Sequence, residues 1–267
     1  MTSLSFTSIP APDHPVPDQI RQTAAGRPIL PVWHNEGATT FRLGEGPAAR
    51  FAKWAPAGSG VDLAGEAARM RWAGAFVTVP RVLEQNSDSQ GAWLVTAALD
   101  GDMAVTDRWK QDPATAVRVI GEALRGLHDA LPVAECPFSA SAQERVAEAE
   151  RAAAGRAHRT LHPDFAGLAP ADALKRVADI PPVDLLVVCH GDTCAPNTLL
   201  SADGRFAGHV DLGALGVADR WSDLAIATWS TTWNYGPGWE EPLLDAYGID
   251  PDPERTEYYR LLWEVGP

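Results

Sequence analysis

The chain has 267 residues, 45% of them hydrophobic, so it can build one large core or two modest ones, which excludes disorder as its main state. Its formal net charge of -13 at pH 7 argues against a nucleic-acid partner, because phosphates require a basic surface, and permits a cationic small molecule. There is no apolar run of membrane-spanning length, no basic and apolar leader, and no CxxC spacing among the three cysteines, so we expect a cytoplasmic protein with reduced thiols and no membrane partner.

The first part of the chain predicts a small antiparallel sheet crossed by one helix. Residues 1–28 contain five prolines and no periodic apolar pattern, which predicts a loose N-terminal segment. Residues 29–98 alternate strand-like runs with turn residues, and apolar residues at helical spacing interrupt them between Leu63 and Gly74. The strand-like runs are ILPVWH, TTFRL, ARFAKWA, VPRVLEQ and AWLVTAAL.

Residues 99–267 predict a larger, mainly helical lobe. The stretches ATAVRVIGEALRGLHDAL and SAQERVAEAERAAAGRA are strong helix formers, the first with one apolar face. Strand patterning returns only in LLVVCH and RFAGHVDL, and the SADG between them predicts a hairpin whose ends carry two HxD motifs. The predicted fold class is therefore α+β, with a sheet-rich lobe followed by a helical lobe.

The two HxD motifs allow a metal site as one interpretation. His190, Asp192, His209 and Asp211 offer imidazole and carboxylate ligands, which suit zinc or iron, and residues two apart on a strand share a face. Such pairs also arise by chance, and no further His or Cys cluster completes the set. A metallohydrolase is therefore the disfavoured alternative of a different class.

The same region supports phosphoryl transfer as the second interpretation. HGDTCAPN followed by DLG places Asp192 on a loop, Asn197 five residues later and Asp211 beyond a turn. In the kinase mechanism a loop aspartate receives the acceptor's hydroxyl proton, while an asparagine and a second aspartate hold Mg²⁺ against the nucleotide phosphates. Positioning and charge neutralisation dominate this chemistry, so oxygen ligands must be separate from the base.

A kinase also needs a lysine on a strand of its small sheet, paired with a glutamate on the next helix. Lys53 lies in RFAKWA, and Glu66 lies in LAGEAARMRWA, on the predicted helix. Either residue alone would be read as a solvated surface charge. Their order and their position upstream of Asp192 favour the kinase interpretation.

From about Pro31 onward, the chain resembles the aminoglycoside O-phosphotransferases of the 3' type, with the streptomycin 3''-phosphotransferases close behind. The resemblance is carried by FAKWAP, LAGEAARMRWA, AWLVTAALDG, LVVCHGDTCAPNTLL and DLGALGVADRWSDLAIA. It implies a two-lobed protein-kinase-like fold that binds ATP or GTP with two Mg²⁺ ions. The implied reaction transfers the γ-phosphate to an antibiotic hydroxyl, the 3'-OH being favoured, and so confers resistance.

Residue by residue, the resemblance implies that Asp192 is the catalytic base and that Asn197 and Asp211 are the metal ligands. It implies that Lys53 and Glu66 hold the nucleotide phosphates. His190 is expected to be a structural brace between the loop and the DLG segment.

The resemblance also implies contacts for the nucleotide base and for the acceptor. Thr96 and Ala98 match the hinge, where backbone groups meet the base. Glu264 matches an acidic residue that holds the ammonium groups of the acceptor. Trp233 and Asn234 are expected to contact the acceptor as well, at positions where relatives can show an acidic pair toward the antibiotic.

Further departures concern the acceptor side. After DLG, Ala214 stands where the family often has arginine. An aromatic cluster on the next helix can stack on a sugar or a cation, but such clusters are more often core. Its predicted members are Trp229, Trp233, Tyr235 and Trp239.

These departures leave three alternatives open: a streptomycin 3''-phosphotransferase, a kinase of another cationic or sugar-like small molecule, and a catalytically inactive nucleotide-binding module. The last is disfavoured because all five residues of the kinase pattern are present. No sequence feature indicates an obligatory protein partner.

Overall fold

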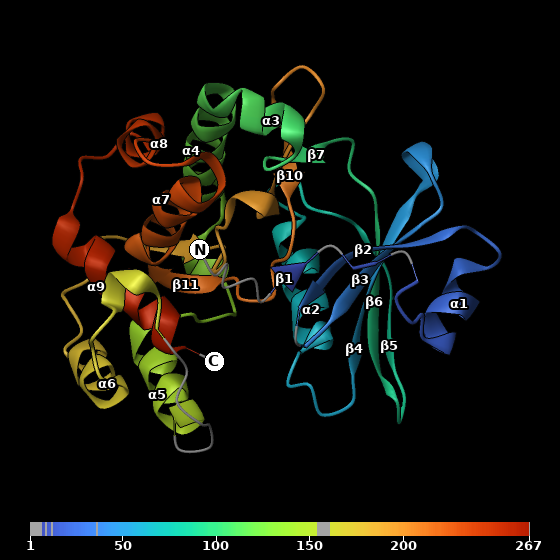
Figure 1. The fold of residues 1–267 in the computed structure, drawn as a ribbon, viewed down its shortest axis with the longest axis horizontal. Helices are drawn as coiled ribbons and strands as arrows, with labels where there is room; N and C mark the ends of the chain where they lie inside the picture. Colours follow the sequence, from blue (N-terminus) through green and yellow to red (C-terminus); the bar gives the residue numbers. More distant parts are fainter. Residues whose placement is uncertain (1–6, 9, 12, 36, 154–160, 267) are drawn as a thin grey trace. The chain divides into compact units, whose positions relative to one another are not determined.

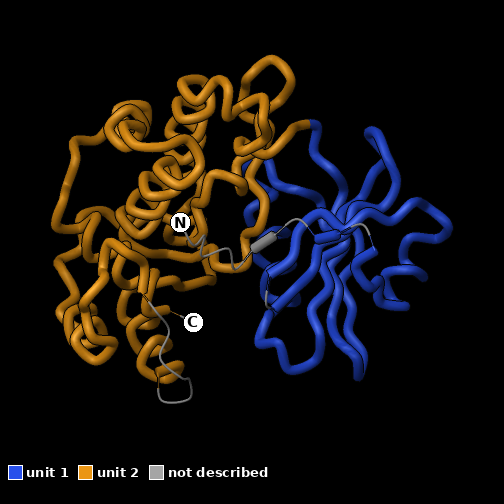
Figure 2. Tube along the Cα trace, in the orientation of Figure 1, with its two compact units in different colours: residues 1–100 blue, residues 101–267 orange. Residues whose placement is uncertain are grey.

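The computed structural model describes residues 7–266 except 9, 12, 36 and 154–160. It divides the chain into two compact units, residues 1–100 and residues 101–267 (Figure 2). Within the described part of the chain, no helix is both long enough and apolar enough to cross a membrane. The antiparallel sheet of the first unit and the helices of the second make the mixed α+β fold that the sequence predicts (Figure 1).

The sheet of the first unit has the strand order β1-β2-β3-β4-β6-β5, and every neighbouring pair is antiparallel. Its later strands agree with the runs predicted from the sequence, because each run is short and bounded by turn residues. The strands are β1 (Thr7–Ser8), β2 (Ile29–Asn35), β3 (Thr39–Leu43), β4 (Arg50–Pro56), β5 (Val82–Ser87) and β6 (Gly91–Ala97), with the 3-10 turn η1 at Gly46–Ala48.

Each face of this sheet is covered by one helix, and Figure 1 shows α1 (Asp18–Ala24) and α2 (Leu63–Ala73) on opposite sides of it. Phe41 and Ala52 are paired in register and pack with Ile20 of α1 in one buried cluster. Because neighbouring residues of a strand point to opposite faces, Lys53 projects to the face that carries α2.

The N-terminal segment is more ordered than predicted. The expectation of a loose segment over residues 1–28 is wrong for residues 18–24, which form α1. The prolines stand before the helix and after it, and Pro17 occupies its N-cap. Ile20 and Ala24, one helical turn apart, are both buried against the sheet, and this packing stabilises a helix too short to form alone. Residues 1–6, 9 and 12 lie outside the described part.

The second unit is mainly helical. Helix α7 is its most deeply placed element, with every residue from Trp221 to Thr231 buried. The predicted apolar face of α4 is also buried, which confirms the helical period read there. The helices are α3 (Asp107–Gln111), α4 (Pro113–Ala130), α5 (Ala142–Ala153), α6 (Pro170–Ala178), α7 (Trp221–Tyr235), α8 (Glu240–Tyr247) and α9 (Pro253–Val265), with 3-10 turns η2 (Val133–Glu135), η3 (Pro163–Phe165) and η4 (Ala195–Asn197).

The strands of the second unit correct one prediction. The expected hairpin between residues 185–190 and 205–212 does not form, because the short run of residues 198–200 takes the place of the first strand. That run directly precedes the SADG turn, so it forms the hairpin. The strands are β7 (Asp102–Met103), β8 (Leu186–Cys189), β9 (Thr198–Leu200), β10 (Phe206–His209) and β11 (Gly216–Asp219), with sheet orders β10-β9-β7 and β11-β8.

Candidate active site

The loop that follows β8 is packed tightly at its second residue. Gly191 has a φ of +87°, and a Cβ there would lie 2.2 Å from the carbonyl oxygen of Ala214. Only glycine fits both the backbone conformation and the close approach. The loop that carries Asp192 therefore lies directly against the segment that follows Asp211.

A buried carboxylate on α7 fixes the backbone of this loop. Asp223 Oδ2 accepts a hydrogen bond from the His190 backbone N–H at 2.7 Å, and its Oδ1 accepts one from the Gly191 N–H at 2.9 Å. The Thr193 hydroxyl donates to the Asp223 carbonyl oxygen at 2.7 Å. Asp223 has no exposed surface, so these bonds operate where water cannot replace them.

Asp223 is supported in turn by His128 of α4. The His128 Nε2 lies 3.0 Å from Asp223 Oδ2, and its Nδ1 lies 2.9 Å from the Tyr247 hydroxyl. Burial raises the pKa of Tyr247 to about 12, so the hydroxyl stays protonated and donates to Nδ1, which leaves Nε2 to donate to the carboxylate. Although burial alone would raise it, the hydrogen bonds from His128 and from the Gly191 backbone hold the pKa of Asp223 below its usual value.

Asp192 and Asn197 are joined directly. The Asn197 side-chain nitrogen donates to the Asp192 carbonyl oxygen and to its Oδ2, both at 3.0 Å. The other carboxylate oxygen, Oδ1, is buried and has no hydrogen-bond partner among the described residues. A buried acceptor without a donor is costly unless a bound molecule supplies one.

The backbone holds Asp211 close to this pair. Val210 donates its N–H to the Asn197 carbonyl oxygen at 3.0 Å, and His190 Nε2 donates to the Val210 carbonyl oxygen at the same distance. His190 thereby makes the contact that a brace between the loop and the DLG segment requires. Asp211 itself has a φ of +62°, a strained conformation that aspartate tolerates better than most residues and that is enriched at functional sites.

This geometry removes the metallohydrolase alternative. His190 uses both ring nitrogens internally, because its Nδ1 accepts the Asp192 N–H while its Nε2 donates to Val210. Within the described residues, the group of ligand atoms close enough to hold a metal is a different one, His128, Cys189 and Asp223, and it is buried. Burial lowers the pKa of His209 to about 3.

In the first unit, Lys53 and Glu66 form the predicted ion pair. The Lys53 Nζ lies 2.9 Å from Glu66 Oε2. The Glu66 side chain is only 7% exposed and that of Lys53 18%, so the pair is shielded from solvent far better than a surface salt bridge. Its register is fixed by β4, where Lys53 pairs with Thr40 on one side and Leu94 on the other.

A model of the phosphotransferase enzyme family matches residues 28–259. The chain belongs to this family. It is 37% identical over 255 residues to an aminoglycoside 3'-phosphotransferase of Streptomyces fradiae, covering 87% of this chain and 94% of that protein. It is 36% identical over 273 residues to the streptomycin 3''-kinase of Streptomyces griseus, covering 94% and 97%.

A solved structure agrees with these sequence relatives. An aminoglycoside phosphotransferase of Streptomyces rimosus, in complex with ADP and streptomycin, aligns with a TM-score of 0.76 at 30% identity, covering 92% of this chain and 95% of that one. The predicted family and the kinase-like α+β fold are thus confirmed, and the chain is an O-phosphotransferase.

In the segment predicted to be the hinge, the backbone already makes hydrogen bonds within the first unit. Ala98 donates its N–H to the Ala49 carbonyl oxygen at 3.1 Å. Thr96 lies in β6, paired with Phe51 and Val82, and is 9% exposed. Contact of Thr96 and Ala98 with a nucleotide base therefore stays a prediction.

An aromatic cluster near the end of α7 presents one open ring. Trp229 is buried, and its ring centroid lies 4.9 Å from that of Trp233, whose side chain is 40% exposed. Trp263 and His162 complete the cluster at 5.9 Å and 6.0 Å from Trp233. Of the predicted members, Tyr235 instead donates its hydroxyl to the Ala104 carbonyl oxygen.

The other two predicted acceptor contacts take part in internal bonds. Glu264 is 6% exposed, and its Oε2 accepts the His162 backbone N–H at 2.6 Å. The Asn234 side-chain nitrogen donates to Ser230 Oγ at 3.1 Å, and that same oxygen accepts the Ala195 N–H at 2.8 Å. Asn234 therefore lies two hydrogen bonds from the loop of Asp192.

Two supporting residues of the phosphotransferase were missed by sequence reasoning. Asp223 lies within the segment VADRWSDLAIA that carries the resemblance, but its bonds reach 32 and 33 residues back along the chain. His128 lies among the buried residues of α4, where the sequence shows only an apolar helix face. The available signal was a carboxylate in the first turn of a helix that has no other charged residue, because a buried charge needs partners.

Proposed function

We propose that the chain transfers the γ-phosphate of ATP to a hydroxyl of an aminoglycoside, with the 3'-OH favoured. The observation that carries the proposal is the buried, unpartnered Oδ1 of Asp192, next to an Oδ2 that Asn197 fixes. A carboxylate held in this way has one oxygen directed to a missing donor, and the acceptor's hydroxyl is such a donor.

Asp192 is the base in the proposed reaction. Its Oδ1 accepts the proton of the acceptor hydroxyl while the hydroxyl oxygen forms a bond to the γ-phosphorus. The bond between that phosphorus and the bridging oxygen breaks, and ADP leaves with the electron pair. The hydrogen bonds that the loop backbone donates to Asp223 keep Asp192 in one position, so little reorganisation is needed during the reaction.

The donor set of the second unit fits a hard divalent cation such as Mg²⁺. Because the Asn197 nitrogen donates to Asp192, its carbonyl oxygen is the atom that remains for a cation. Asn197 and Asp211, adjacent through the bond between residues 197 and 210, would hold the metal. When bound, Mg²⁺ supplies charge neutralisation for the phosphate oxygens. In the first unit, Lys53 would hold the α and β phosphates, with Glu66 fixing its position.

The acceptor is proposed to be cationic, which the net charge of -13 favours. The aromatic cluster supports this choice, since the Arg260 guanidinium already lies 5.5 Å above the Trp229 ring. The open face of Trp233 can take a cationic or sugar group of the acceptor in the same manner. Streptomycin is the second candidate acceptor, favoured by the 36% identity to the streptomycin kinase.

An acceptor panel tests the proposed function. Purified protein with Mg²⁺ and ATP is expected to phosphorylate kanamycin or neomycin, with ADP release matched to product, and NMR is expected to place the phosphate on the 3'-oxygen. Exclusive turnover of streptomycin would move the assignment to the 3'' alternative. Absence of turnover with all three would refute the aminoglycoside assignment.

Removal of the exposed Trp233 ring tests whether the aromatic cluster contacts the acceptor. Trp233→Ala is expected to raise KM for the aminoglycoside about fivefold with kcat nearly unchanged, because a stacked cation contributes about 1 kcal/mol at a partly exposed site. Steady-state kinetics at saturating ATP measures this split. Trp233→Phe keeps an aromatic face and is expected to recover most of the lost affinity. If Trp233→Ala leaves KM unchanged, the cluster is core only.

A further inference from the structure

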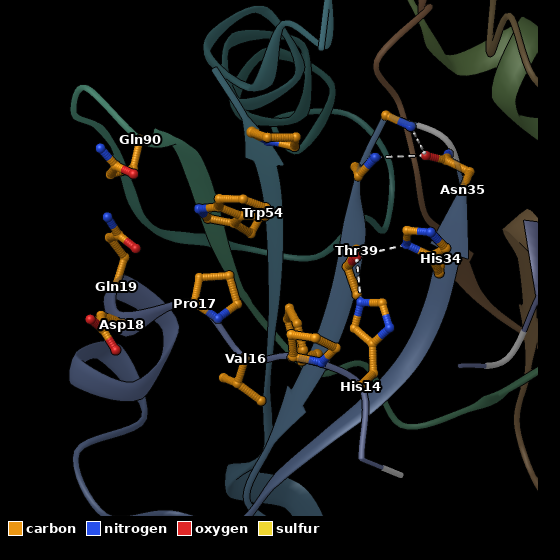
Figure 3. Close-up of a pocket in the computed structure, with 15 residues that line it drawn as sticks. His14, Val16, Pro17, Asp18, Gln19, His34, Asn35, Thr39, Trp54 and Gln90 are labelled. Atoms are coloured by element: carbon orange, nitrogen blue, oxygen red, sulfur yellow. Dashed lines mark hydrogen bonds between the residues drawn. The ribbon is translucent and has the colours of Figure 1, made fainter. Parts of the chain in front are cut away.

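A pocket lies on the face of the first unit's sheet that α1 covers, opposite the face of Lys53. It has a volume of about 420 Å³, within the range of small-molecule sites. Its walls come from the segment that leads into α1, from the β2–β3 hairpin and from Trp54 of β4 (Figure 3). Because Trp54 neighbours Lys53 on one strand, the two side chains point to opposite faces, and the pocket is separate from the proposed nucleotide site.

The floor and one side of the pocket are apolar. Phe41 is fully buried beneath the base of the pocket, and Trp54 lies beside it on the next strand. Val16 and Pro17 face them from the segment before α1 (Figure 3). Two aromatic rings and two aliphatic side chains leave a surface that suits a flat, apolar ring.

One end of the pocket is closed by a polar bridge. The Thr39 hydroxyl lies 2.8 Å from His34 Nδ1 and 3.3 Å from His14 Nε2, and the two imidazole centroids are 5.0 Å apart. One hydroxyl can donate to one ring and accept from the other, so these three groups satisfy one another. They hold the segment before α1 against the hairpin and do not need a ligand.

The indole nitrogen of Trp54 differs from this bridge. It is buried, and it makes no hydrogen bond to any described residue. Figure 3 shows it on the side of Gln19 and Gln90, and the Gln19 side-chain nitrogen is already engaged with Asp88 Oδ2 at 2.7 Å. A buried N–H without an acceptor is unfavourable, and a bound molecule that supplies the acceptor would remove that cost.

We propose that this pocket binds a small, uncharged, planar heteroaromatic molecule whose ring carries an acceptor for the Trp54 N–H. The ring packs on Val16 and Pro17, and the acceptor meets the Trp54 N–H on the side where Gln90 lies. Gln90 is exposed on the turn between β5 and β6, so its side chain can turn away without disturbing the sheet. An anion is disfavoured because Asp18 lies at the rim and the chain is strongly acidic.

Quinoline and naphthalene test this site, because they share one shape and only quinoline has a ring acceptor. Titration of nucleotide-free protein, labelled with ¹⁵N at its indole groups, is followed by NMR. Quinoline is expected to bind at least about tenfold more tightly than naphthalene, the effect of one hydrogen bond, and to shift the Trp54 indole resonance. Trp54→Phe assigns that resonance and is expected to reduce quinoline affinity to the naphthalene level.

Trp72→Phe, on α2 across the sheet, is the matched control and is expected to bind quinoline like the unaltered protein. Equal affinity for both probes, or a Trp54 resonance that quinoline does not shift, overturns the proposal without use of any variant. Retained quinoline affinity in Trp54→Phe overturns it as well. No nucleotide or aminoglycoside is present, so neither result bears on the proposed phosphotransferase reaction.

Discussion

Asp192→Asn is expected to lower kcat for aminoglycoside phosphorylation by about a thousandfold or more, while the affinity for nucleotide changes less than about twofold. The reason is that a positioned base acts on the transition state, where removal of one typically costs a factor of about 100 to 10,000. An amide keeps the shape of the carboxylate and an acceptor for the Asn197 side-chain nitrogen, but it cannot take the hydroxyl proton. Coupled ADP release and nucleotide titration measure the two quantities separately.

Asp192→Ala tests the same role with a second variant. In this variant the Asn197 side-chain nitrogen loses one of its two acceptors. The variant is expected to be inactive, and its nucleotide affinity is again expected to persist. Turnover at the normal rate in either variant would remove Asp192 from its assigned role and leave the family assignment intact. If both nucleotide binding and turnover are lost, the substitution has instead disrupted the structure of the loop.

Asp223→Ala is expected to abolish turnover and to destabilise the protein by about 3–5 kcal/mol, the loss typical when one partner of a buried charged network is removed. The change leaves the backbone N–H groups of His190 and Gly191 and the ring of His128 without their acceptor. The midpoint temperature of thermal unfolding should then fall by roughly 10 °C for a chain of this size. Asp250→Ala, at an exposed position, is the matched control and is expected to change neither property.

The stability lost in Asp223→Ala should depend on pH in one direction. The pKa of Asp223 is held below its usual value in the folded protein, so its ionised form stabilises the fold above the pKa of an unfolded aspartate, about 4. The stability difference between the unaltered protein and Asp223→Ala should be constant at neutral pH and shrink as pH falls through the depressed pKa. Urea unfolding across that range measures it, and a difference that grows toward acid would contradict the assignment.

The sequence predicted those site residues whose partners lie nearby in the chain, on elements with a visible periodicity. Lys53 and Glu66 occupy a strand and the helix that follows it, and strand and helix periods are visible in the sequence. Asp192 and Asn197 stand on one loop, so their spacing alone suggested a joint role, and the side chains do meet.

Features that depend on distant packing were not predictable in the same way. Residues 198–200 were too short a run to read as a strand, and the pairing of β8 with β11 instead of β10 follows from contacts between separate segments. Helix α1 forms because the sheet buries Ile20. This tertiary packing outweighs the tendency of the surrounding prolines to disfavour a helix. Asp223 accepts hydrogen bonds from backbone N–H groups, which every residue type except proline has, so the sequence does not identify its partners.

Helix α7 carries two functions at opposite ends. Asp223 near its start holds the loop backbone, and Trp233 near its end offers the open aromatic face, about 15 Å further along a rigid rod. Sites that far apart contribute to stability and activity almost independently. If Trp233 contacts the acceptor as proposed, a lineage can change the residue at position 233, and with it the range of acceptors, while the phosphoryl-transfer residues are inherited unchanged.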